Sequence, residues 1–151
     1  QEGALMLAFA VAKYLPTVVD TLTFDETGPS GNLFVTWMPS TPDLCVGILG
    51  QPGQPQLSKL PVDLPGLQVL VCGARYDTRT PFDLARSIYS ALTCLDNVTL
   101  DQGGDDEVRV IGCTALQSDP TSIGRDDNDR PEWSLNFTLR THAPTAHRSL
   151  P

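Results

Sequence analysis

The sequence is short of basic side chains, and this shortage limits what the protein can bind. Among its 151 residues, Lys13 and Lys59 are the only lysines, beside eight arginines, and the formal net charge is −8. Proteins that grip nucleic acid neutralise phosphates with basic groups, so this balance argues against DNA or RNA binding. An acidic surface instead repels phosphates, and DNA can pass it without adhering.

Histidine is equally scarce, and other common catalytic and metal-binding patterns are missing. His142 and His147 both lie at the C-terminus, so a nucleophile in the body of the chain has no imidazole base nearby in sequence. No C-x-x-C pair and no G-x-x-x-x-G-K-[ST] loop is present, which removes zinc-ligand spacing and a phosphate cradle. The acidic run 126–129 does not fit a calcium loop, because the fifth position is Arg130 in one register and Pro131 in the other. We therefore expect no enzyme activity, no metal and no cofactor.

No hydrophobic run is long enough to cross a membrane. The apolar stretch 4–12 is shorter than the about 20 residues that a bilayer requires, and it lacks the basic flank and cleavage site of a secretory signal. We expect neither membrane insertion nor export. Cys45, Cys72, Cys94 and Cys113 each lie in an apolar stretch, which favours four buried thiols over two disulfides.

The first third of the chain predicts one helix and two strands. Residues 4–15 are strong helix formers that stop at Pro16, and their apolar side chains go almost all the way round the helix. This pattern is typical of a core helix or of a helix packed between subunits. Residues 32–38 and 44–49 predict strands of a hairpin, and 50–65, with four prolines, predicts an extended surface loop.

The middle of the chain predicts a central strand and then a helix. Residues 66–74 are apolar on both faces, as in a strand covered on both sides. Thr80 then offers an N-cap, Pro81 occupies the first helical position and Asp83 completes a variant of the capping box, before apolar residues recur at helical spacing up to Leu92.

The last third predicts further strands. Residues 97–100 and 108–116 flank a glycine-centred turn and predict a hairpin, with a β-bulge near Gly112 where the apolar alternation changes phase. A clean alternation over 133–140 predicts a strand with one core face and one polar face.

These elements predict an α+β fold, in which a mixed, mainly antiparallel β-sheet carries two main helices on one face. We expect a single domain over residues 1–141 and an extended C-terminal tail over 142–151, which has too little apolar surface to offset its ordering entropy.

One segment resembles a known family. Residues 122–137, SIGRDDNDRPEWSLNF, are similar to the "LGRDENGRPEFSLNF"-like signature of the phage minor capsid family, whose members are tail terminator or tail completion proteins. The Arg75-Tyr-Asp77 link and the following helix agree with that family, and the resemblance spans about residues 4–141. Asp129 departs from the signature, which has glycine there, so we expect Asn128 to adopt the left-handed conformation.

The resemblance implies a structural virion protein, assembled in the host cytoplasm, at the head–tail junction. Such proteins form rings, commonly hexameric, that cap the tail tube, stop its polymerisation and join it to the head. The implied partners are further copies of the chain, the tail tube protein and the head–tail connector or stopper protein, while DNA passes without specific binding. The expected interface residues lie in exposed turns, namely Arg125, Asp126, Asp127, Asn128, Asp129, Arg130, Gln54, Lys59 and Arg79.

Other interpretations remain open at this point. The chain can instead be a head completion or stopper protein, or the equivalent component of a gene transfer agent. From other classes, it can be a small acidic ligand-binding domain or enzyme, or a host-directed binding module with an exposed apolar patch. The segment 122–137 can also be no more than a hairpin connection, held by Arg125 or Arg130 pairing with nearby carboxylates.

Overall fold

A computed structural model describes residues 2–28, 30–55 and 60–142 of the chain. Within them the helices are α1 (Glu2–Tyr14), a short 3-10 turn (Leu15–Thr17) and α2 (Arg79–Thr93), and the strands are β1 (Leu33–Val35), β2 (Cys45–Gln54), β3 (Val62–Cys72), β4 (Asp96–Leu100), β5 (Val108–Ala115), β6 (Thr121–Arg125) and β7 (Pro131–His142).

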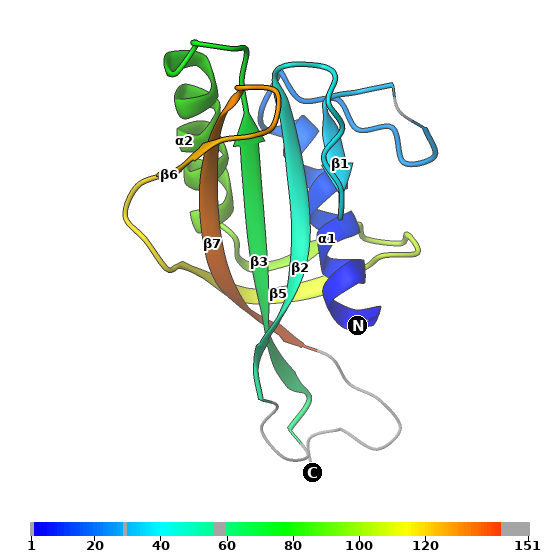
Figure 1. The fold of residues 1–151 in the computed structure, drawn as a ribbon. Helices are drawn as coiled ribbons and strands as arrows, with labels where there is room; N and C mark the ends of the chain where they lie inside the picture. The colour runs from blue at the N-terminus through cyan, green and yellow to red at the C-terminus, as the bar shows by residue number, and fades with distance from the viewer. Residues whose placement is uncertain (1, 29, 56–59, 143–151) are drawn as a thin grey trace.

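The strands form one curled, mixed sheet in the order β1-β2-β3-β7-β5-β4 (Figure 1). All pairs are antiparallel except β1–β2. The long strand β7 pairs with β6 near its start, through Ser122 and Trp133, and with β5 near its end, through Arg109 and His142. At the end of the sheet where β7 begins, the outer strands are therefore β1 and β6.

Both helices pack on the same face of this sheet, as the sequence predicts. The apolar side chains on the inward face of β7 (Leu135, Phe137 and Leu139) form one buried cluster with Val11 of α1 and Ile88 of α2. Each fully buried side chain of this size stabilises the fold by about 1.5–3 kcal/mol relative to exposure. The predicted α+β fold class is thus confirmed.

Lys13 at the end of α1 ties the helix to the turn between β4 and β5. Its Nζ lies 2.8 Å from Asp106 Oδ2, 3.1 Å from Asp101 Oδ2 and 3.7 Å from Glu26 Oε1. The hydrogen bond to Asp106 is the largest cause that raises the pKa of Lys13. The pKa of Asp101 is lowered, first by a hydrogen bond from the Asp106 amide and then by Lys13.

The predicted hairpin between residues 32–38 and 44–49 is wrong. Both segments contain strands, but β1 runs parallel to β2, with Leu33 opposite Val46. The chain leaves β1 at Thr36, which has a φ of 71°, and the loop that follows brings it back to the same end of the sheet. All residues of β1 are buried in this arrangement.

The predicted loop over residues 50–65 is shorter than expected. Both β2 and β3 extend into it and pair with each other, up to Gln54 opposite Leu64. A β-bulge between Gln51 and Gln54 explains how the pairing tolerates Pro52, because a bulge leaves a residue outside the ladder of hydrogen bonds.

The predicted cap of α2 is also wrong in detail. The helix begins at Arg79, and the carboxylate of Asp77 accepts the hydrogen bond from the Thr80 amide at 3.1 Å. Thr80 is therefore inside the first turn rather than the cap. An aspartate satisfies the free amides of a helix start as well as a threonine does, so both candidates fitted the sequence.

Later elements match the predictions more closely. The hairpin of β4 and β5 is present, and the bulge near Gly112 is confirmed by a register shift between Val110 and Gly112 against β7. Strand β6 was not predicted, because all of its residues are exposed and show no alternation. The four cysteines are free, and Cys45 and Cys72 are buried as predicted. Cys113 is only partly buried and Cys94 is exposed, contrary to the prediction for these two thiols.

Strand β7 continues to His142, the first residue of the predicted tail. The rest of that tail lies outside the described residues.

Candidate interaction surfaces

The turn between β6 and β7 contains most of the predicted interface residues, and Asp126 organises it. Asp126 Oδ1 accepts hydrogen bonds from the amides of Asn128 and Arg130, both at 2.9 Å, and its carbonyl accepts one from the Asp129 amide at 3.0 Å. Asp129, with a φ of 60°, takes the left-handed conformation, so the expectation for Asn128 is wrong. Aspartate tolerates this conformation, which explains how it replaces the glycine of the family signature.

Arg130 is not on the surface but inside the protein, with 4% of its area exposed. Its Nε and Nη2 both lie 2.7 Å from Asp126 Oδ2. Nη2 also donates to the Pro39 carbonyl at 3.0 Å, and Nη1 donates to the carbonyls of Pro42 at 3.1 Å and Asp43 at 3.4 Å. The planar guanidinium thus joins the β6–β7 turn to the loop that precedes β2. We refer to this arrangement as the Arg130 clamp.

The electrostatics of the clamp follow from this geometry. Burial opposes the charge on Asp126, but hydrogen bonds from Arg130 and the Asn128 amide outweigh it, and the pKa of Asp126 is lowered. Burial likewise opposes the charge on Arg130, yet pairing with Asp126 keeps its pKa raised. Cys45 and Cys72 face each other across β2 and β3 beside the guanidinium. The Cys72 hydrogen bond and then Arg130 lower the pKa of Cys45 against the effect of burial.

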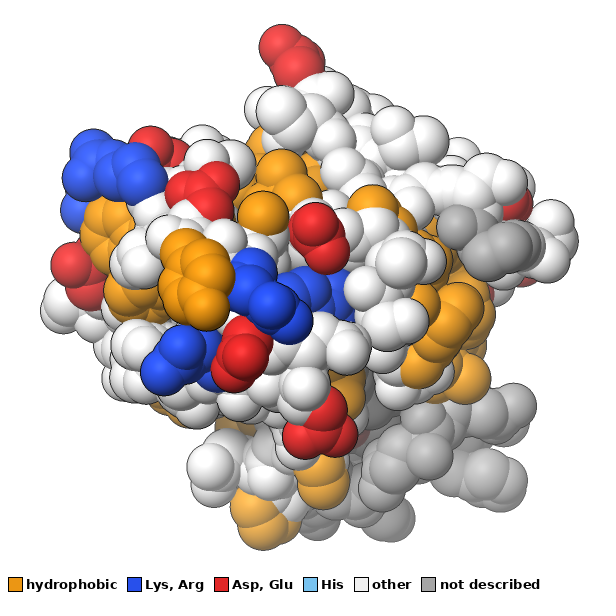
Figure 2. Space-filling view, turned by 45° about the horizontal axis from the view of Figure 1, so that its top comes forward, with side chains coloured by type: hydrophobic (Ala, Val, Ile, Leu, Met, Phe, Trp, Pro, Cys, Tyr) orange, Lys and Arg blue, Asp and Glu red, His pale blue; other side chains and the backbone are white. Residues whose placement is uncertain are grey.

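The remaining residues of the turn, Arg125 and 127–129, are exposed. Figure 2 looks onto this end of the molecule and shows basic, acidic and hydrophobic side chains close together on it. Arg79 lies at the same end, at the start of α2, where its side chain is 81% exposed and pairs with Asp83 at 3.2 Å. The structure therefore brings Arg79 and the turn to one end of the molecule.

The other predicted interface residues lie elsewhere. Gln54 is exposed at the far end of β2, because β2 starts beside the Arg130 clamp and runs away from it. Lys59 lies outside the described residues.

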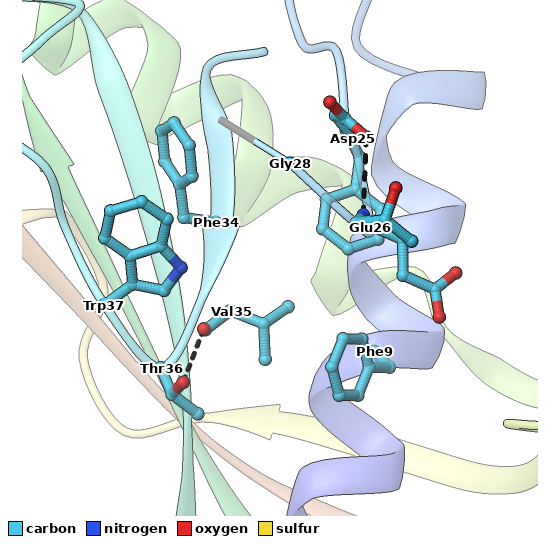
Figure 3. Close-up of a pocket in the computed structure, with 10 residues that line it drawn as sticks. Phe9, Asp25, Glu26, Gly28, Phe34, Val35, Thr36 and Trp37 are labelled. Atoms are coloured by element: carbon cyan, nitrogen blue, oxygen red, sulfur yellow. Dashed lines mark hydrogen bonds between the residues drawn. The ribbon is translucent and has the colours of Figure 1, made fainter. Parts of the chain in front are cut away.

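A second candidate surface, missed by sequence reasoning, is a hollow of about 400 Å³ along the outer edge of β1 (Figure 3). Aromatic rings from α1, β1 and the neighbouring loops line it: Phe9 and Phe24 have centroids 6.4 Å apart, and Phe34 and Trp37 are 5.0 Å apart. Trp37 is 50% exposed. The aromatic spacing of Phe34-Val-Thr-Trp37 was the only feature in the sequence that could have indicated it. We call this the aromatic hollow.

Two carboxylates line the aromatic hollow, and they differ in how far hydrogen bonds hold them in place. Asp25 holds its own loop, because it accepts hydrogen bonds from the amides of Thr27 and Ser30 at 3.3 Å each, and the Ser30 side chain is the largest cause that lowers its pKa. Glu26 has a half-exposed side chain, whose nearest cation, Lys13, is 3.7 Å away. The hollow therefore presents aromatic rings and an accessible negative charge.

At the opposite edge of the sheet, β6 is the outermost strand. Leu116 is 64% exposed and Ile123 is 49% exposed. Gln117 fixes this edge in place: its side chain donates to the Ser134 carbonyl at 2.8 Å and to Thr121 Oγ1 at 2.7 Å, and it accepts the Asn136 amide at 2.9 Å. We call the exposed strand with Leu116 the β6 edge.

Neither surface offers the groups of a metal site. Among residues 2–28, 30–55 and 60–142, no three His, Cys, Asp or Glu side chains gather closely enough to hold a metal ion. In the same ranges, no helix has the length and hydrophobicity of a membrane span.

The comparison with known protein families decides the classification. The model of the family described as bacteriophage tail terminator protein matches residues 18–142. The chain belongs to the bacteriophage tail terminator family. This membership makes it a structural component of a phage-like virion. A search of curated proteins finds no match.

A solved structure supports the same fold. The chain is similar to a component of the virion of a native gene transfer agent particle, with a TM-score of 0.56 and 17% identity over 94% of this chain and 97% of that chain. At this identity the likeness concerns the fold.

Proposed function

We propose that this protein terminates the tail: copies of it form a ring, hexameric by the family resemblance, that caps the finished tail tube and stops its polymerisation. The observation that supports this proposal is the family match over residues 18–142. The two ends of the sheet are compatible with it, since one end carries the Arg130 clamp and its exposed turn, and the paired residues Gln54 and Leu64 of β2 and β3 lie at the other.

The two ends of such a subunit would meet different partners. A terminator stands between the tail tube protein and the head–tail connector or stopper protein, at the head–tail junction, and therefore needs two faces of different character. The exposed turn 127–129 and Arg79 form one face. Gln54 and the hairpin it belongs to extend the opposite one. Loops presented by a rigid sheet can contact partners without disturbing the core.

The acidic composition suits a channel for DNA. Six copies at −8 each would carry a formal total of −48. Any share of this charge that faces the lumen repels phosphates, so DNA would pass without adhering. In a ring structure, a neutral or basic channel with the acidic loops outside would contradict this part of the proposal.

Electron microscopy of particles from a strain that lacks the gene tests the function, with the gene supplied in trans as control. Tails of abnormal, variable length beside intact heads are the expected result. Tails of normal length, unattached to DNA-filled heads, would move the protein to a joining or stopper role. Wholly normal infectious particles would contradict the structural function, and a search for ligands that raise the melting temperature would then follow.

A further inference from the structure

The two outer edges of the sheet, at β1 and at β6, differ in character, although both border the same end of the molecule. Among the named strands of the described residues, β1 pairs with β2 alone and β6 with β7 alone, and beyond β1 a single parallel bridge joins Phe24 to Leu33. The edge at β1 carries the aromatic hollow and the carboxylate of Glu26. The β6 edge carries exposed aliphatic side chains and Arg125.

The charges of the two edges are complementary. In an acidic chain, arginines gather beside the β6 edge: Arg79 and Arg86 lie over the Phe82 ring, at 6.0 and 5.9 Å from its centroid. Figure 2 agrees, because the visible Lys and Arg side chains lie at its left and centre, and none appears at its right. Arg79 and Arg86 are each paired with an aspartate, at 3.2 and 3.3 Å. Arg125 forms no ion pair with the described residues.

From these observations we infer that the aromatic hollow of one copy takes the β6 edge of the next copy. Ile123 packs against the rings of the hollow, and the guanidinium of Arg125 approaches the carboxylate of Glu26. An arginine is attracted by a carboxylate, whose geometry its planar guanidinium matches. The inference rests on the proposed ring, for which it names the subunit contact.

This contact joins two different surfaces, so it can be repeated from copy to copy until the rotation closes a ring. It is a contact of side chains rather than a continued sheet. Strand β6 carries a bulge between Ser122 and Arg125, and Gly124 has a φ of 97°. A bulged edge is a poor template for another strand, which prevents open-ended pairing of sheets.

Cross-linking in assembled particles tests the contact. In a Cys94→Ser background, which removes the exposed thiol, a variant with both Trp37→Cys and Ile123→Cys is treated with a short bifunctional maleimide and run on a denaturing gel. A ladder of bands beyond the dimer, ending at the ring, is expected, because each copy links to two neighbours. Monomers alone would overturn the inference, and a ladder that stops at dimers would overturn the head-to-tail arrangement. The single-cysteine variants are the controls.

If Trp37→Cys does not assemble, Thr27→Cys with Ser122→Cys replaces the pair, because both residues are exposed on the same two surfaces. Their ladder is read in the same way.

A charge exchange gives an independent test. Arg125→Glu is expected to lower the yield of complete particles by about tenfold or more, because like charges then face each other. Adding Glu26→Arg should restore most of that yield, which a merely structural role of Arg125 does not predict. Arg140→Glu, the same change at an exposed position on β7, should have little effect. Equal losses in Arg125→Glu and in the double variant would contradict the contact.

Failure of this contact and failure of the proposed function are distinguishable. Abnormal tails in the deletion strain without a cross-linked ladder would contradict only the contact. Normal particles in the deletion strain would contradict the function itself.

Discussion

Replacing Arg130 with methionine tests whether the clamp stabilises the fold from within rather than serving as a surface contact. Methionine keeps much of the length of the side chain and removes the guanidinium. The carboxylate of Asp126 loses its ion pair at 2.7 Å, and the carbonyls of Pro39 and Pro42 lose donors at 3.0 and 3.1 Å. The loop before β2 then has no tie to the β6–β7 turn through this side chain.

The size of the effect follows from burial. Removing one partner of a buried ion pair costs about 3–5 kcal/mol, because the remaining charge stays without compensation. Asp126 keeps its two amide donors and has 18% of its side chain exposed, which favours the lower half of that range. A domain of this kind has a total stability of about 5–15 kcal/mol, so a loss of about 3–4 kcal/mol is a large part of it.

Urea unfolding followed by tryptophan fluorescence measures this loss, since Trp37 and Trp133 lie close in sequence to the clamped segments. Arg125→Met is the matched control, the same change at an exposed position of the same hairpin, and should alter stability by less than about 0.5 kcal/mol. The slope with urea should stay unchanged in both variants. If Arg130→Met loses less than about 1 kcal/mol, or no more than the control, the reasoning on the clamp is refuted.

Three further outcomes are expected. In the native protein a thiol reagent should modify Cys94 fast and the other cysteines slowly, and four fast thiols in mass spectrometry would contradict their burial. Gly53→Ala should destabilise the fold more than Gly103→Ala, as thermal unfolding would show: both positions have positive φ, but a Cβ at Gly53 would meet a backbone carbonyl at 2.0 Å and one at Gly103 meets nothing within 4 Å. Lys13→Met should lower the melting temperature most between pH 3.8 and 10.5. Because the pKa of Lys13 is raised in the folded protein, its contribution to stability is complete below pH 10.5 and is lost as the pH rises through the folded pKa. The pKa of its partner Asp101 is lowered, so the contribution of this ion pair to stability fades as the pH falls below 3.8. An equal difference at all pH values would show that charge is not the cause.

Local sequence patterns were sufficient to predict those elements whose structure depends on the spacing of their own apolar residues. The alternation along β7 predicted its core face, and the phase change near Gly112 predicted the bulge. The helix that starts near Pro81 was predicted from apolar spacing, although its cap was placed on the wrong residue. In each of these cases the residues that determine the element are neighbours in the sequence, so their spacing carries the information.

Pairing and burial over long distances were decided by the tertiary structure alone. The parallel pairing of β1 with β2 depends on where the loop after Thr36 is held, and that loop is bound by Arg130, about 90 residues further along the chain. A buried arginine cannot be read from composition, because arginine is mostly exposed unless it is paired. The sequence by itself determined the fold class, the acidic charge and the family resemblance. Only the folded chain placed the aromatic hollow and the β6 edge at opposite edges of one sheet. Residues 9, 24, 34 and 37 meet in the hollow only after the strands have paired.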